Sequence, residues 1–301
     1  MTLLAAGSVA LAAAGDRLVA EPPACYHPVA WLGRALGPLD RPWRHPRVAG
    51  VATALFAPLL AAAAVAGVVA LGSRIDPVVG ATVAGLALFV STSRRMLVDE
   101  ARAVVAASES DLPAARKRLR SLAGRDATTL SAGEVRSAAV ESAAENLSDG
   151  LVAPLLGFVA LAPLSLPAAA GAAAWVKAVN TLDSTFGYRS VPMGWAPARL
   201  DDIAMFLPAR AGAILLAVAA GRPGALRRAR PLARRPASPN AGWPMATLAV
   251  ALDVRLTKPD VYDLPAADAL PTPADATRGV AVVSRAGWLA FGLTAGVVAL
   301  C

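Results

Sequence analysis

The chain has 301 residues, of which 56% are hydrophobic and 17% are charged, and its mean hydropathy is +0.53. This composition is too apolar for an ordinary soluble domain and predicts a polytopic membrane protein with sizeable polar segments. A net charge of +8 also suits a nucleic-acid-binding protein, but the aromatic residues form no stacking pattern beside the basic clusters. Basic cytoplasmic loops explain the charge better, and we predict no nucleic-acid partner. Cys25 and Cys301 give neither a disulfide framework nor a metal-binding spacing, which indicates a reducing compartment.

Uncharged runs place the first membrane segments. Residues 1–15 are apolar but lack the basic start of a signal peptide, so we expect a retained helix. Residues 48–73 lie between two arginines and are long enough to cross a bilayer. Residues 77–93 follow a tight turn, and the two runs together predict a helical hairpin over residues 48–93.

The later apolar runs are interrupted. Residues 150–176 carry no charge but contain three prolines, and they predict either one kinked span or two half-length helices. Residues 203–221 are broken by Arg210, and residues 287–300 predict the last span.

Three connecting segments, residues 34–47, 94–136 and 222–235, are basic and by the positive-inside rule face the cytoplasm. Segments 94–136 and 222–235 then lie on the same side, so the chain must cross the membrane an even number of times between them. One crossing at 150–176 and one at 203–221 would place residues 180–190 outside, unless one of the two segments is re-entrant. The sequence leaves both arrangements open.

Residues 94–149 read as helical. The first helix has one face marked by Leu97, Ala101, Val104 and Ser108. A second helix starts after Asp111 and ends at Gly124. Ser131 and Glu134 have the spacing of a capping box and open a third helix that runs to about Asp149.

No strand periodicity is visible, so the predicted fold class is all-α, a polytopic integral membrane protein with a helical cytoplasmic domain and an active site at the membrane interface. The predicted parts are residues 1–93 with a polar loop at 16–47, the cytoplasmic domain at 94–149, a membrane or re-entrant core at 150–221, a basic and proline-rich cytoplasmic loop at 222–280, and a transmembrane helix at 281–301.

Three carboxylates, Glu141, Glu145 and Asp149, are spaced four apart on the third helix and share one arc of it with Ser142 and Asn146. Like charges at this spacing are destabilising, and a cation would relieve them. Glu145, Asn146 and Asp149 can share one Mg²⁺, and Glu141 would then serve a second ion or a substrate amine. A solvated acidic surface is the alternative. The three carboxylates lie at the predicted membrane interface, where a charge without a binding partner costs free energy, and this position favours a functional site.

The stretch "WVKAVNTLDSTFGY" (175–188) puts Lys177 at the end of an apolar run, with polar residues including Asn180 and Asp183 after it. Such a lysine either snorkels to the interface or binds phosphate or carboxylate, and the polar residues favour binding. In "ARLDDIAMFLPAR" (198–210), Asp201 and Asp202 lie between Arg199 and Arg210. They form either part of the same site or an internal ion-pair network.

Two shorter motifs carry weaker signals. "HPVAWLGR" (27–34) holds His27, which is structural in the ordinary case and gains functional weight only from its neighbours, Arg34 among them. "SPNAGWP" (238–244) predicts a rigid turn around Asn240 that is suited to presenting backbone amides to an anion.

These motifs, in this order, resemble the cobinamide-phosphate synthase family of cobalamin biosynthesis, the CobD/CbiB family. The resemblance runs from Asp16 to about Tyr262 and also includes "DRLVAEPP", "GRD" at Gly124 and "AVESAAENLSDGLVAPL". The sequence departs from the family pattern at Val19-Ala20, at Val176 and at Met245. Methionine at position 245 stands where the family has glutamate, which puts a role for an acid there in doubt.

The resemblance implies a multi-pass ligase of the plasma membrane with its site facing the cytoplasm. Its substrates would be adenosylcobyric acid and (R)-1-amino-2-propanol O-phosphate or a related amino alcohol. Forming an amide from an unreactive carboxylate requires ATP as co-substrate, most simply through an acyl phosphate, together with Mg²⁺. Membrane lipid and other enzymes of cobalamin biosynthesis are expected as further partners. No P-loop is present, so the ATP site is inferred from the reaction.

The expected roles follow from this reaction. Glu145, Asn146 and Asp149 would hold Mg²⁺–ATP, and Glu141 would orient or deprotonate the amine. Lys177 and Arg199 would neutralise phosphates, while Asp183, Asp201 and Asp202 would ligate a second metal or position substrate. His27 would contact the corrinoid. The other expected substrate-binding residues are Arg34, Asn180, Arg210 and Asn240.

A membrane transporter of corrinoids or other anions is the alternative, because it would also use broken helices and buried charge. A transporter needs polar residues along a route through the bilayer, whereas here they gather at helix ends. A purely structural partner in a cobalamin-synthesis complex would not need clustered carboxylates.

Overall fold

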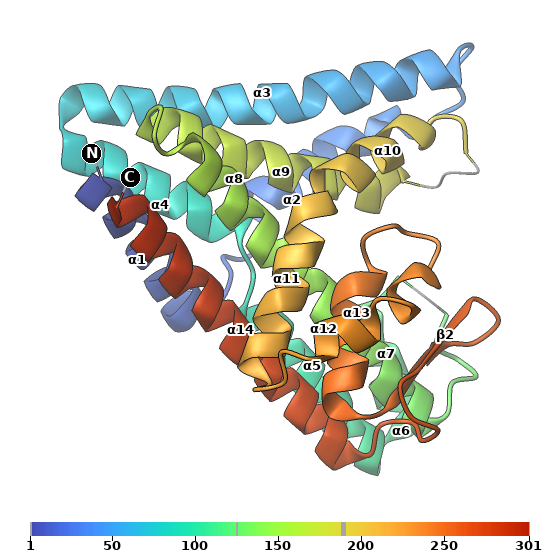
Figure 1. Ribbon diagram of the computed structural model, residues 1–301. Helices are drawn as coiled ribbons and strands as arrows, with labels where there is room; N and C mark the ends of the chain where they lie inside the picture. The colour runs from blue at the N-terminus through green and yellow to red at the C-terminus, as the bar shows by residue number, and fades with distance from the viewer. Residues whose placement is uncertain (1, 125, 188–190, 301) are drawn as a thin grey trace. The chain divides into compact units, whose positions relative to one another are not determined.

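The computed structural model describes residues 2–124, 126–187 and 191–300, and these are mostly helical (Figure 1). The α-helices are α1 (Thr2–Val19), α2 (Pro28–Leu36), α3 (Pro46–Ile75), α4 (Pro77–Ser91), α5 (Arg95–Ser110), α6 (Leu112–Leu119), α7 (Ala132–Leu147), α8 (Ala153–Leu161), α9 (Leu166–Phe186), α10 (Trp195–Ala204), α11 (Phe206–Ala219), α12 (Ala225–Ala229), α13 (Gly242–Leu252) and α14 (Pro273–Leu300). A π-helical turn, η2, covers Ser148–Val152, and two short strands, β1 (Arg255–Lys258) and β2 (Tyr262–Pro265), form a hairpin.

Among the described residues, five helical segments are long and apolar enough to cross a membrane. They are Thr2–Val19, Pro46–Ile75, Pro77–Ser110, Ala132–Leu161 and Pro273–Leu300. Helices α10 and α11 pass the same test only when taken together. The predicted fold class, an all-α polytopic membrane protein, is confirmed.

The chain folds as two compact units. Unit 1 contains Met1–Ser93, Ala153–Met205 and Ala290–Cys301, and unit 2 contains Arg94–Val152 and Phe206–Leu289. The five parts predicted from the sequence describe membrane topology rather than packing, and they stay a prediction.

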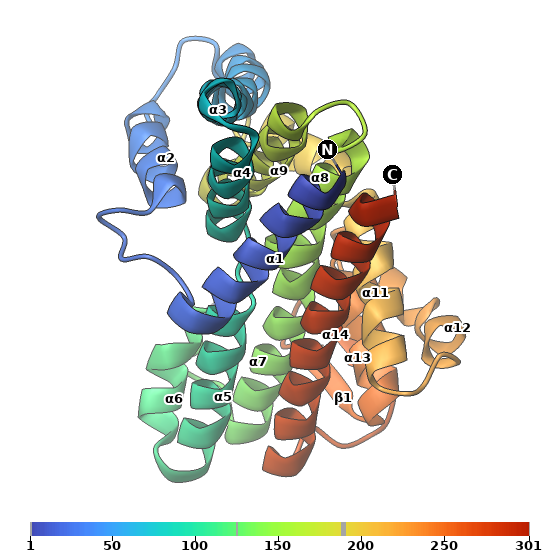
Figure 2. The ribbon, with the colours of Figure 1, turned by 90° about the vertical axis from the view of Figure 1, so that its left-hand side faces the viewer.

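Unit 1 is built on close packing of apolar helices. Helix α3 lies along α9 and forms with α4 the hairpin expected over residues 48–93 (Figure 1). Helix α1 packs against α4, as Figure 2 shows, and the Ser8 hydroxyl donates a 2.8 Å hydrogen bond to the Ala81 carbonyl. Small residues let these backbones approach, because Gly171 of α9 faces the Ala62 carbonyl of α3 with no side chain between them.

The apolar run at 150–176 forms two helices rather than one kinked span. Helix α8 ends at Leu161, and the hydroxyl of Ser165 caps α9 by accepting the Ala168 amide. Helix α7 does not stop before this run, because it continues through η2 into α8 without a break, and where the membrane segment begins stays a prediction. The last helix is also longer than predicted and starts at Pro273.

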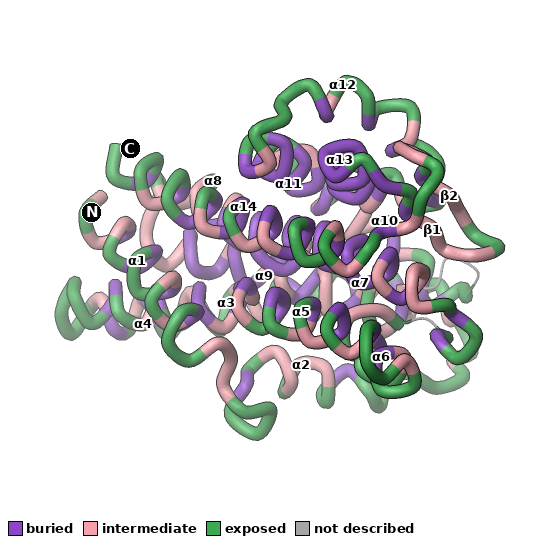
Figure 3. The backbone as a smooth tube through the Cα atoms, turned by 90° about the horizontal axis from the view of Figure 1, so that it is seen from below, coloured by how far each residue is buried: buried purple, intermediate pink, exposed green. Residues whose placement is uncertain are grey.

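Unit 2 is organised around α7, which packs against α5, α6, α13 and β1. The predicted capping box is present, with Ser131 accepting from the Glu134 amide and Glu134 accepting from the Ser131 amide. The four predicted face residues of α5 are all buried. Helix α13 is buried along nearly its whole length, as the purple tube in Figure 3 shows.

Two local features of unit 2 differ from what the sequence indicates. Helix α6 ends at Leu119 rather than Gly124, because the chain turns there through bonds such as the Ser121 amide to the Arg118 carbonyl. The sequence shows no strand periodicity, yet β1 and β2 pair antiparallel with Leu256 opposite Leu264. Strands of four residues are too short to show a periodicity, and packing against α7 stabilises the hairpin.

The tight α3–α9 contact predicts that Gly171→Ala destabilises the protein. A Cβ at Gly171 would come to 3.0 Å from a backbone oxygen, so α3 or α9 must move, and we expect a loss of about 1–3 kcal/mol. Thermal unfolding in detergent measures the effect. The control is Gly67→Ala on α3, where a Cβ meets nothing within 4 Å and the change should stay within about 1 kcal/mol of wild type. Equal unfolding midpoints for the two variants would contradict the packing argument.

Candidate functional site

His27 is the N-cap of α2 and lies buried, with 7% of its surface exposed. Its Nδ1 accepts a 3.2 Å hydrogen bond from the Val29 amide, and its Nε2 lies 3.6 Å from a carboxylate oxygen of Glu21. An Nδ1 that accepts a hydrogen bond belongs to a neutral imidazole. Burial lowers the pKa of His27, the Glu21 carboxylate opposes this shift, and the Lys177 ammonium adds to it. The structure therefore brings His27 and Lys177 within electrostatic reach of each other.

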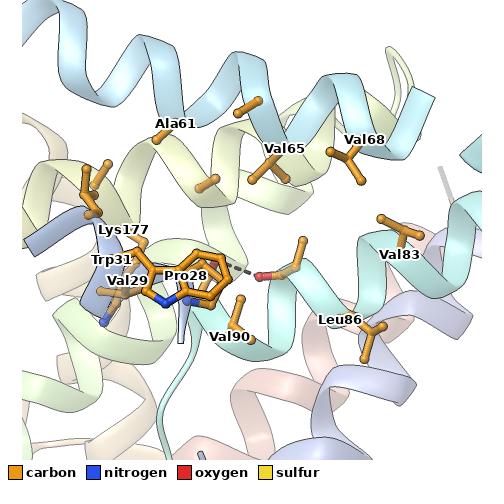
Figure 4. A pocket seen from close by; sticks show the side chains of 16 residues that line it. Pro28, Val29, Trp31, Ala61, Val65, Val68, Val83, Leu86, Val90 and Lys177 are labelled. Carbon is orange, nitrogen blue, oxygen red and sulfur yellow. Dashed lines mark hydrogen bonds between the residues drawn. The ribbon is translucent and has the colours of Figure 1, made fainter. Parts of the chain in front are cut away.

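Lys177 lines an apolar cavity of about 550 Å³ between α2, α3, α4 and α9 (Figure 4). Of the sixteen residues that line it, only Lys177 and Ser91 carry polar side-chain groups other than an indole N–H, and the Ser91 hydroxyl donates to the Ala87 carbonyl. Trp31 and Val65 are among the apolar walls. A cavity of this size suits a small-molecule ligand or part of a larger one. The combination of apolar walls with one ammonium group fits the contact region of an amphiphilic anion.

The polar residues after Lys177 are arranged along α9. The Thr181 hydroxyl donates to the Lys177 carbonyl at 2.8 Å, and the Ser184 hydroxyl donates to the Asn180 carbonyl at 2.9 Å. These two hydroxyls therefore hydrogen-bond to their own helix. Asn180 and Asp183 are half-buried, and Asp183 accepts the Gly187 amide through its backbone carbonyl where the helix ends. Tyr188, the last residue of the predicted motif, lies outside the described residues.

The two aspartates of the 198–210 motif, Asp201 and Asp202, lie on α10 and are half-buried. Arg199 lies 3.7 Å from Asp202, one helical turn away, so the ion-pair alternative holds for this pair. Asp201 is half-buried on the same helix. Arg34 of α2 is exposed and donates a 3.4 Å hydrogen bond to the Ala24 carbonyl.

In unit 2, Glu141 is completely buried on α7 and accepts hydrogen bonds from two hydroxyl groups. Ser137 donates to one carboxylate oxygen at 2.9 Å, and Tyr262 of β2 donates to the other at 2.9 Å. Ser137 also accepts the amide of Thr257 in β1 at 2.7 Å. The network ties both strands of the hairpin to α7. A catalytic role for Glu141 stays a prediction, beside the structural role that these contacts define.

Sequence reasoning missed Ser137 and Tyr262. Ser137 stands one helical turn before Glu141, which was a usable signal, whereas nothing local links Tyr262 to α7 across 121 residues. Met245 is buried, and its sulfur lies 3.6 Å from the Tyr262 hydroxyl. Tyr262 also lines a polar cavity of about 490 Å³ beside the hairpin. It therefore joins the buried carboxylate to the wall of that cavity.

The predicted metal ligands lie on the last turn of α7 and in η2. Asn146 uses its side-chain nitrogen to donate to the Ser142 carbonyl at 2.9 Å, which leaves its oxygen as the ligand atom. Glu145 and Asp149 are half-buried, and Asp149 lies in the π-helical turn. Hard oxygen donors of this kind fit Mg²⁺. Within the described residues no group of three or more His, Cys, Asp or Glu side chains has metal-binding geometry, so the two carboxylates and the amide would need water or phosphate oxygens to complete the shell.

Arg210 and Asn240, both predicted to bind substrate, contact each other in unit 2. The Arg210 guanidinium donates to the Asn240 side-chain oxygen and to the carbonyls of Phe206 and Pro239, and it stacks over the rings of Phe206 and Trp243. These contacts fasten the "SPNAGWP" turn to α11. The amides of Asn240 and Ala241, which were expected to face an anion, donate instead to the hydroxyl of Ser238.

The buried neutral His27 predicts a pH-dependent stability. Because the folded pKa lies below the unfolded pKa, His27 contributes stability above its unfolded pKa, and this stability is lost as the pH falls through the folded value. Protonation of Nδ1 would also remove the N-cap acceptor of α2. Between pH 7.5 and pH 5, wild type should therefore lose more thermal stability than His27→Gln does. This window spans the ordinary histidine pKa of roughly 6.5. Parallel pH profiles for the two proteins would refute this.

Removing one hydroxyl from the Glu141 network should weaken the hairpin. Tyr262→Phe leaves a buried carboxylate oxygen without that donor, and we expect a loss of about 1–3 kcal/mol in thermal unfolding, with faster amide exchange in residues 255–265. Tyr26→Phe is the matched control, because Tyr26 is 72% exposed. Unchanged exchange of the hairpin amides in Tyr262→Phe would show that the hydroxyl does not anchor it.

Comparison with known proteins agrees with the family that the sequence resembles. A family model described as CobD/Cbib protein matches residues 9–286. The cobalamin biosynthesis protein CobD of Geobacter metallireducens is 40% identical over 273 residues, covering 85% of this chain and 83% of its own. The protein of the same name from Rhodobacter capsulatus is 37% identical over 296 residues, with 90% of each chain covered. No solved structure is significantly similar to the chain.

A third relative comes from an archaeon. The probable cobalamin biosynthesis protein CobD of Methanothermobacter thermautotrophicus is 36% identical over 257 residues, covering 83% of each chain. The family model and these relatives all extend across both compact units. The chain belongs to the CobD/CbiB family of cobalamin biosynthesis proteins.

Proposed function

We propose that the protein is an adenosylcobinamide-phosphate synthase of the plasma membrane. It would join adenosylcobyric acid to (R)-1-amino-2-propanol O-phosphate, or a related amino alcohol phosphate, and hydrolyse ATP in the process. Membership of the CobD/CbiB family supports cobalamin biosynthesis. The observation that carries the finer proposal is the apolar cavity with Lys177 at its wall and His27 beside it.

An amphiphilic anion matches this cavity. The corrinoid combines a large apolar surface with polar amides and a reacting carboxylate, and the amine substrate carries a phosphate. The apolar walls from α2, α3, α4 and α9 can contact the apolar surface of the corrinoid. The Lys177 ammonium can neutralise either the corrinoid carboxylate or the phosphate of the amine substrate. His27, neutral because of its burial and its N-cap bond, would contact the ligand without placing a second fixed cation beside Lys177.

The reaction requires the carboxylate to become a better electrophile. The carboxylate oxygen attacks the terminal phosphorus of ATP, ADP leaves, and an acyl phosphate forms. The amine then loses a proton and attacks the acyl carbon, and inorganic phosphate leaves as the amide bond forms. Cationic side chains such as Lys177 and Arg199 would stabilise the charge that develops on phosphate in the first step.

Mg²⁺–ATP would be bound through the oxygens of Glu145, Asn146 and Asp149. Bound Mg²⁺ neutralises phosphate charge and orients the phosphate chain. The Asn146 amide is oriented by its bond to the Ser142 carbonyl, and Asp183, Asp201 and Asp202 would position substrate or a second ion. We place the active site on the cytoplasmic side, where ATP is available, and other cobalamin-biosynthesis enzymes as partners that deliver or accept the corrinoid.

The alternative function, transport of corrinoids or other anions, predicts movement of the substrate without a covalent change. The polar residues in the described helices favour ligation, because Lys177, Asn180 and Asp183 occupy the second half of α9 rather than its full length. Uptake of corrinoid into proteoliposomes with no amide product would support the transporter.

The proposal predicts an ATP-dependent mass gain on adenosylcobyric acid when detergent-purified protein is incubated with the amine phosphate and Mg²⁺. Lys177→Gln and Lys177→Arg should lower kcat/KM about 100-fold or more, because arginine's planar fork does not replace a compact ammonium in a shaped site. Lys117→Gln, on the exposed face of α6, should leave the rate unchanged. A fully active Lys177→Arg would return Lys177 to a snorkelling role, and a wild-type protein that forms no amide would overturn the ligase.

A further inference from the structure

Residues 222–235 form an arginine loop that includes α12 and carries no acidic residue. Its six arginines are all exposed, namely Arg222, Arg227, Arg228, Arg230, Arg234 and Arg235. The loop is held to unit 2 through its alanines, since Ala225, Ala229 and Ala233 are buried against residues of α13 such as Val250. Figure 2 shows α12 beside α11 and α13. The segment is therefore a fixed surface with its charges facing outward.

Most of this charge is not neutralised by the protein. Within the described residues, four of the six arginines, Arg222, Arg227, Arg230 and Arg234, make no side-chain hydrogen bond or ion pair. Arg228 lies 3.9 Å from the Asp253 carboxylate, and Arg235 donates to the Asp263 backbone carbonyl. Several arginines of α5 and α6, by contrast, are neutralised by carboxylates. Arg95 and Arg102 both pair with Asp99, and Arg118 pairs with Glu100.

The helix that precedes the loop presents an apolar face. Leu207, Ile214 and Val218 of α11 are between 51% and 69% exposed and are spaced at seven and four residues, which places them on one side. The helix ends at Ala219, Gly221 two residues later has a φ of +66°, the left-handed conformation typical of a C-terminal cap, and Arg222 follows at once. The apolar face thus stops where the run of arginines begins.

We propose that the arginine loop of residues 222–235 binds anionic phospholipid headgroups at the membrane surface where α11 leaves the hydrocarbon region. An exposed apolar helix face that ends in a cluster of cations matches the boundary between lipid tails and phosphate groups. Clusters of four to eight basic residues next to a membrane helix attract anionic lipids through their summed charge. The inference is independent of the ligase chemistry, because it rests on the surface of unit 2 alone.

The test measures lipid preference with the full-length protein. The protein is equilibrated in detergent micelles that contain equal amounts of phosphatidylcholine and phosphatidylglycerol, and the lipids that copurify are counted by class with native mass spectrometry. Wild type should retain phosphatidylglycerol in preference, and the preference should fall at high salt because exposed charges are screened. Changing Arg222, Arg227, Arg230 and Arg234 to Gln should lower the preference on the order of tenfold.

Two further variants control for charge and folding. The same four positions changed to Lys should keep the preference, since attraction to headgroups depends on charge rather than on guanidinium geometry. A matched quadruple change to Gln at Arg95, Arg102, Arg118 and Arg120 removes the same charge from arginines near carboxylates and should reduce the preference far less. Helix content and the unfolding midpoint should be unchanged in both loop variants, because the four loop arginines are exposed. In the control variant they should change little, because the ion pairs that it removes lie at the surface.

Three results would overturn the proposal. One is an equal loss of phosphatidylglycerol in both Gln variants, which would show a response to net charge alone. Another is a preference that survives removal of the four loop arginines. The third is binding of inorganic triphosphate to wild type that is lost in the loop variant, without any lipid preference, which would assign the surface to a soluble polyanion.

Discussion

Burying a polar or charged group in an apolar interior costs free energy unless a partner is held against it, and this constraint decides how the polar motifs of this chain fold onto its helices. His27 is buried with an amide and a carboxylate on its two ring nitrogens. Glu141 is buried with a hydroxyl on each oxygen. Arg210 is held by three oxygen acceptors and two aromatic rings. Glu141 and Arg210 each have at least one partner from a distant part of the sequence, so satisfying these two groups also fixes the β-hairpin and the 238–244 turn.

The same constraint gives the motifs unequal roles. Glu141 and Arg210 each contact several partners within the protein, and they hold the β-hairpin and the 238–244 turn in place. Lys177 lies at the wall of an apolar cavity, where its ammonium can contact a ligand. A family motif can therefore contain both structural and reactive residues side by side. The proposed chemistry needs both, because a large corrinoid must be positioned before a weakly reactive carboxylate can be activated.

Much of the helical architecture was predictable from local signals. Charge-free runs located α3 and α4, and the Ser131–Glu134 spacing located the start of α7, because both depend on nearest neighbours in sequence. The β-hairpin was not predictable, since its strands are short and are stabilised by α7 more than 100 residues away. The π-helical turn at 148–152 was missed for a related reason: its geometry is selected by packing, and Ser148 lies directly against Gly212 of α11. For the candidate site, the sequence indicated Lys177 because it ends a charge-free run, and the carboxylate helix because its acids are spaced four apart. The hydrogen bond between Tyr262 and Glu141 could be found only in the tertiary structure.

The central claim is that this chain uses ATP to make an amide from a carboxylate, and isotope transfer tests it most directly. Adenosylcobyric acid labelled with ¹⁸O in its reacting carboxylate is incubated with the amine phosphate, Mg²⁺–ATP and the purified protein. Activation as an acyl phosphate predicts one ¹⁸O in the inorganic phosphate released for each amide formed. Amide formation with no label in phosphate would contradict this route, and label in AMP would assign an adenylate instead. Consumption of neither ATP nor the carboxylate would contradict the ligase itself.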